Sequence, residues 1–187
     1  MGWGEGRASV NRFRHVSIVL LSAALLGGCF QPLYSTSSET GRPAVRDALS
    51  AIDIQQIDAA ANTSEAPLAV QIRNDLLFNF TGGGYSAPPT HKLKVQINGN
   101  RAVVAIDRAT ALPNVETYTL RTTYSLTEIA TGKVVVTANA STAVSYDTLG
   151  QQRFARLSGM HDAERRAAKV LSDNITTRLA SYFISGS

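Results

Sequence analysis

Alternation of apolar and polar residues through most of the segment 92–146 is the feature that most limits what this chain can fold into. Apolar residues occupy every second position in 92–98, and the pattern recurs in 117–126 and 134–146. A period of two residues predicts strands with one buried face. The opposite face of these strands is rich in Thr and Ser, which favours an antiparallel sheet with one wet side.

Asn98-Gly99 interrupts the first of these strands. It is compatible with a tight hairpin turn, or with a bulge in a strand that continues through Ile106. We favour the bulge. A shorter strand is expected ahead of these three, within Ser50–Asp58, where isoleucines recur with one slip in their alternation.

Two other segments show the period of a helix. From Leu68 to Phe80 an apolar residue recurs every fourth position, and Gly82-Gly83-Gly84 then predicts the end of that helix. Apolar residues step by three or four from Met160 to Tyr182, with charges between them. The predicted order is β-α-β-β-β-α. This order indicates an α+β fold, a small, mainly antiparallel four-stranded sheet with two helices packed on one face.

The N-terminus is typical of a bacterial lipoprotein leader. Three arginines precede the uncharged run Val16–Leu26, and Gly27-Gly28 then lead to Cys29, the only cysteine. We therefore expect residues 1–28 to be a signal peptide and Cys29 to carry a diacylglycerol and an N-acyl chain. An ordinary secretory leader is the alternative. A membrane-spanning helix needs about 20 apolar residues, more than the segment 16–28 supplies.

The leader divides the chain into three parts. Residues 29–49 are expected to be the lipidated N-terminus and a flexible tether, and 50–187 a single α+β domain. Without the leader, 15 basic and 13 acidic residues remain, a net charge of +2. The high isoelectric point is therefore no argument for nucleic acid. A lipidated lone cysteine leaves no disulfide to stabilise the domain.

The residues offer little support for catalysis. His15, His91 and His161 lie far apart in the sequence, no metal-ligand spacing appears, and no nucleophile elbow is present. Asp107 and Glu116 are interpreted as polar loop residues rather than a carboxylate pair. We expect no enzyme and no cofactor beyond the lipid on Cys29.

Basic residues on the predicted strands and turns suggest binding instead. If the strands pair as predicted, six of them gather along one side of the sheet, namely Lys92, Lys94, Arg101, Arg108, Arg121 and Lys133. Such a basic, hydroxyl-rich surface suits phosphate groups. The alternative is scattered solubilising charge, with lysines that guard the sheet edges against aggregation.

Several segments resemble the LPS-assembly lipoproteins of the LptE family. They begin with Cys29-Phe30-Gln31-Pro32-Leu33-Tyr34 and continue with Tyr124-Ser125-Leu126, Ala130-Thr131-Gly132-Lys133-Val134, Ser145-Tyr146-Asp147 and Phe154-Ala155. The last is the helix around 162–168 with Ile175, Arg178-Leu179-Ala180 and Tyr182-Phe183. Order and spacing are the specific part. The stretch from Gly99 to Val115 departs most from the family.

The resemblance implies a fold of two helices on a small sheet and a non-catalytic role. Members of this family occupy the lumen of the outer-membrane β-barrel LptD, help to assemble it, and bind lipopolysaccharide on its way to the outer leaflet. The six basic residues would then contact lipid A or core phosphates. Phe30, where an aspartate often signals inner-membrane retention, points by family analogy to the outer membrane, with the domain on the periplasmic side.

Three other functions remain open from sequence. A periplasm-facing lipoprotein could serve as an adaptor of another envelope complex without binding lipopolysaccharide. A lipid-anchored enzyme lacks a convergent set of catalytic groups. A secreted carbohydrate-binding domain would favour exposed aromatic residues, whereas Tyr118, Tyr124 and Tyr146 fall on the predicted apolar faces.

Overall fold

The computed structural model describes residues 45–59, 63, 65–109, 111, 113–148 and 153–185. The elements in chain order are α2 (Val45–Ser50), β1 (Ile52–Ile54), α3 (Glu65–Thr81), β2 (His91–Ile106), β3 (Pro113–Glu128), β4 (Val134–Asp147) and α4 (Arg153–Ser185). The predicted signal peptide, Cys29 and the tether up to residue 44 lie outside the described residues.

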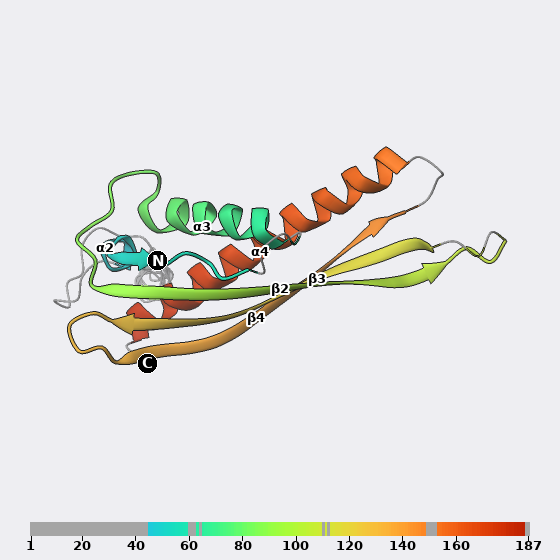
Figure 1. Ribbon diagram of the computed structural model, residues 1–187. Helices are drawn as coiled ribbons and strands as arrows, with labels where there is room; N and C mark the ends of the chain where they lie inside the picture. The colour runs from blue at the N-terminus through green and yellow to red at the C-terminus, as the bar shows by residue number, and fades with distance from the viewer. Residues whose placement is uncertain are drawn as a thin grey trace, which may run out of the picture. The chain divides into compact units, whose positions relative to one another are not determined.

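The four strands form one sheet in the order β1-β2-β3-β4. β1 runs parallel to β2, whereas β2, β3 and β4 pair antiparallel. Figure 1 shows α3 and α4 together on one face of this sheet, with α4 running diagonally across the long strands. The structure confirms the predicted α+β class, since the sheet is mixed but mostly antiparallel and helices pack against it.

The core lies between the helices and the inner face of the sheet. The apolar set of α3 predicted from its four-residue repeat is buried, from Leu68 to Phe80. Leu171, Ile175 and Leu179 of α4 are fully buried as well. From the sheet, alternate residues of β2 and β3 point into the same layer, as their period of two predicts.

Two helix boundaries differ from expectation. Val45–Ser50 forms the short helix α2, and its Leu49 is 1% exposed, so the last part of the expected tether belongs to the core. α4 begins at Arg153, ahead of the expected start at Met160. The sequence did not reveal these first turns, because they carry few buried residues and give no apolar stripe.

Asn98-Gly99 is not a bulge. β2 passes through it in regular register, with Gly99 opposite Leu120, and the register shifts of β2 fall between Val103 and Ile106. The glycine is needed for space instead. A Cβ atom at residue 99 would collide with the Tyr118 hydroxyl and the Glu65 carboxylate, which both lie over it.

Candidate binding surface on the sheet

The outer face of the sheet, turned away from the helices, is a lattice of hydroxyl and amide side chains. Antiparallel register sets side chains of three strands in rows across this face. Two such rows are Gln96, Thr123 and Asn139, and Asn98, Arg121 and Ser141. No helix covers this face among the described residues (Figure 1). Its groups therefore face solvent or a polar partner.

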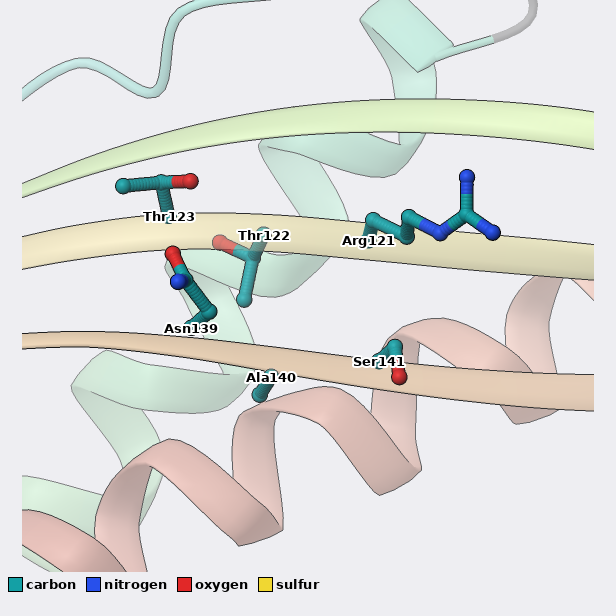
Figure 2. Close-up of a pocket in the computed structure, with 6 residues that line it drawn as sticks. All are labelled: Arg121, Thr122, Thr123, Asn139, Ala140 and Ser141. Atoms are coloured by element: carbon teal, nitrogen blue, oxygen red, sulfur yellow. The ribbon is translucent and has the colours of Figure 1, made fainter.

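A hollow of about 420 Å³ lies at the middle of β3 and β4. Its lining is made of Arg121, Thr122, Thr123, Asn139, Ala140 and Ser141, and Figure 2 shows the Arg121 side chain extending along β3. The Thr122 hydroxyl is already committed, since it donates to the Gln96 carbonyl at 2.9 Å. The guanidinium, hydroxyl and amide groups that remain are suited to an anionic or sugar-like group.

Three of the six basic residues share the outer face. Lys92 and Lys94 alternate with buried Leu93 on β2, and Arg121 lies on the same side of β3. All three are exposed. Lys94 Nζ also lies 3.5 Å from the Asp58 carboxylate. Both side chains are exposed, so this ion pair contributes little and Lys94 can exchange it for another anion.

The other three lie elsewhere. Arg101 belongs to the inner face, where its Nη2 lies 3.4 Å from the Glu164 carboxylate of α4. Arg108 is in the connection between β2 and β3, and Lys133 is in the connection between β3 and β4, at opposite ends of β3. The expected gathering of six residues therefore reduces to three. The sequence did not reveal this, because the side of each residue depends on the pairing register.

Glu116 is a buried strand residue, which corrects its interpretation as a loop carboxylate. It is 8% exposed on the inner face of β3. The Tyr146 hydroxyl donates to Glu116 Oε2 at 2.5 Å, and Arg156 Nη2 donates to Oε1 at 2.7 Å. Burial and this carboxylate raise the pKa of Tyr146 to about 12. Both oxygens of the Glu116 carboxylate therefore have partners, and the carboxylate joins the first turns of α4 to β3 and β4.

Three further ionisable groups in or beside the inner layer are Tyr118, His161 and His91. Among the described residues, the buried Tyr118 hydroxyl has no hydrogen-bond partner. Burial, followed by the charges of Glu65 and Glu164, raises the pKa of Tyr118 to about 12. His161 Nδ1 lies 3.1 Å from Glu164 Oε2. His91 packs edge-on against Phe183, and burial lowers its pKa. The Thr90 hydroxyl lies 2.8 Å from His91 Nδ1, at an exposed position.

Among the residues that the structure describes, no group of three His, Cys, Asp or Glu side chains is placed to hold a metal ion. No helix in the same part of the chain is long and apolar enough to cross a membrane. Tyr118, Tyr124 and Tyr146 are buried as expected, so none of them offers a ring to a sugar.

Several solved structures with the same fold are described as bacterial lipoproteins. A candidate lipoprotein from Caulobacter crescentus CB15 matches with a TM-score of 0.55 and 22% identity, covering 76% of this chain and 97% of its own. Rare lipoprotein B from Shewanella oneidensis matches at 0.52 and 10%, covering 71% and 96%. A lipoprotein B from Nitrosomonas europaea matches at 0.54 and 10%, covering 80% and 94%.

No protein-family model and no curated protein matches the chain. The likeness to solved structures therefore shows the fold alone, at low identity. These structures are described as lipoproteins, and their descriptions name no catalytic role. The chain has an LptE-like fold of the kind seen in rare lipoprotein B.

Proposed function

We propose that this chain is a lipid-anchored plug and assembly partner of an LptD-type outer-membrane barrel, and that it binds lipopolysaccharide during insertion into the outer leaflet. Cys29 carries the anchor, and the domain lies on the periplasmic side within the barrel lumen. The outer sheet face is the observation that carries the proposal. It is uncovered, rich in hydroxyl and amide groups, and bears three exposed cations on a fold shared with lipoproteins.

The chemistry of that face supports both parts of the proposal. The lumen of a large outer-membrane barrel is polar, so a plug needs a polar surface toward the wall. Lys92, Lys94 and Arg121 supply charge-assisted hydrogen bonds to phosphates, and the hydroxyls of Thr123 and Ser141 in the Arg121 hollow supply further donors. Arg101 takes no direct part, because it is already paired with Glu164 beneath the sheet.

A lipoprotein adaptor of another envelope complex is the second candidate. The lipoprotein-like fold and the leader fit it equally well. The basic face favours the first candidate, because it presents Lys92, Lys94 and Arg121 at exposed positions on one side of the sheet, where phosphates can contact them.

Charge reversal on this face tests lipopolysaccharide binding. The full chain with Lys92→Glu and Arg121→Glu is compared with wild type for binding to purified lipopolysaccharide in mild detergent. Two lost phosphate contacts at about 1.4 kcal/mol each predict a loss of roughly 100-fold in affinity. Circular dichroism is expected to remain unchanged, since both side chains are exposed.

The matched control reverses two cations on the helix side of the molecule. Arg165→Glu with Lys169→Glu makes the same change in net charge at exposed positions of α4. This control is expected to bind within about twofold of wild type, apart from the long-range charge effect that both variants share. Equal binding by wild type and the Lys92/Arg121 variant would reject the assignment of this face.

A further inference from the structure

The outer edge of β4 is long, regular and uncovered. β4 pairs with β3 on one side, and no strand in the described part of the chain pairs with its other side. From Val136 to Asp147 the pairing with β3 is regular, and the one register shift comes before Val136. Such an edge presents a row of backbone N–H and C=O groups to any strand that aligns with it.

This edge lacks the features that keep strand edges from associating. Residues 134–146 contain no charged residue, no proline and no glycine. The opposite edge of the sheet is protected, because β1 covers the start of β2, and the uncovered remainder carries Arg101 and the register shifts between Val103 and Ile106. Proteins use charges and bulges in this way to prevent pairing. The contrast between the two edges indicates that the β4 edge is the one available to pair with another strand.

The sequence of β4 is self-complementary in one antiparallel alignment. With Ala140 opposite Ala140 of a second copy, Val136 faces Val144 and Asn139 faces Ser141. The same alignment brings Lys133, in the connection just before β4, near Asp147 at the end of β4 in the other copy. If the centre of the pairing moved from Ala140 to residue 139 or 141, Lys133 would lie two residues away from Asp147 of the other copy. The attraction between these two charges therefore favours the register centred on Ala140.

We propose that the chain, when no barrel partner holds it, forms a symmetric dimer in which two β4 edges pair antiparallel about Ala140. Residues of equal parity face each other in this register, so the inner faces of both copies stay on the same side. The four strands of each copy then continue into one sheet, with the helices of both copies covering one face. The proposal goes beyond the plug function and concerns the chain alone.

Disulfide trapping at the symmetry axis tests the register. Residues directly opposite in an antiparallel pair have Cα atoms about 4.5–5.5 Å apart, within the range of about 4.4–6.8 Å that a disulfide spans. Ala140→Cys in the full chain, purified in mild detergent and oxidised, is expected to give a covalent dimer in most of the protein. Wild type, whose only cysteine is Cys29, is oxidised in parallel and is expected to give no covalent dimer.

Ala138→Cys is the matched control. It makes the same substitution on the same strand and face at a similarly half-buried position. In the proposed register the two copies of residue 138 lie four residues apart along the strands, about 13 Å, so at most a few per cent of the protein crosslinks. Equal crosslinking at 138 and 140, or none at 140, would overturn the proposal.

A charge-swap pair tests the dimer without a covalent bond. Thr137 faces Ala143 of the second copy in this register. Thr137→Lys with Ala143→Lys sets like charges opposite each other twice, and is expected to weaken the dimer at least about tenfold in sedimentation velocity. Thr137→Lys with Ala143→Glu perturbs the same positions but restores attraction, and is expected to dimerise. Identical behaviour of the two variants, or a monomeric wild type at about 50 μM, contradicts the proposal.

Discussion

At the scale of single residues, two buried carboxylates fix the helix layer to the sheet. Glu116 joins Tyr146 of β4 and Arg156 of α4, and Glu164 of α4 joins Arg101 of β2. A buried charge is tolerated only when its oxygens are satisfied, as both of these are. Sequence reasoning missed these roles, because neither residue carries a local signal of its partner across the layer.

Tyr146→Phe is expected to lower the free energy of unfolding by about 1–2 kcal/mol at pH 7, because it removes the hydroxyl donor from a buried carboxylate. The measurement is urea unfolding followed by circular dichroism. Tyr182→Phe is the control, since Tyr182 is only half-buried and its hydroxyl has no role in this group. An unchanged midpoint for Tyr146→Phe would contradict the structural role of the Glu116 group.

The same tyrosine predicts a dependence on alkaline pH. Its pKa rises from 10.0 to about 12 on folding, so the folded state favours the neutral hydroxyl. This contribution is fully present below pH 10 and declines as the pH rises through about 12. Wild type should therefore lose stability over this range more steeply than Tyr146→Phe does. Parallel curves for the two proteins would contradict the raised pKa.

At the scale of elements, the sequence predicted most of the architecture. Alternation in β2, β3 and β4 identified which residues point inward, and the four-residue repeat identified α3. These patterns are strong because burial on one face imposes them directly. The short helix α2 and the first turns of α4 were not predicted, since neither has an apolar repeat long enough to read.

Two glycines with opposite requirements test this account of the elements. Gly99→Ala is expected to destabilise the domain by about 1–3 kcal/mol, because the new methyl group meets Tyr118 and Glu65. Gly159→Ala, within α4, meets only ordinary contacts and gains about 0.5–1 kcal/mol of helix stability. Thermal unfolding of both variants measures whether the stability falls for Gly99→Ala and rises for Gly159→Ala. A neutral Gly99→Ala would contradict the close approach in β2.

At the scale of the whole molecule, the candidate site was only partly predictable. The sequence identified the basic residues and the polar outer face, but not which residues share it. Lys92, Lys94 and Arg121 do, whereas Arg101 lies beneath the sheet. Pairing register decides this, and register depends on the contacts of the whole sheet rather than on any one strand.

The lipid anchor on Cys29 also belongs to this scale. Each methylene of an acyl chain buried in the membrane contributes about 0.8 kcal/mol, and several chains together give stable attachment. Cys29→Ala is therefore expected to lose the domain from outer-membrane fractions, while Ser35→Ala, in the expected tether, leaves it there. Membrane fractionation with immunoblotting measures this. Outer-membrane residence of Cys29→Ala would contradict lipidation at this residue.

The most direct test of the plug proposal is the recovery of its partner. The tagged full chain is purified from native membranes in mild detergent, beside Cys29→Ala, and the co-purifying proteins are identified by mass spectrometry. The proposal predicts one large outer-membrane barrel in stoichiometric amount with wild type. Recovery of a different envelope complex, or of no barrel, would contradict it and favour the adaptor function.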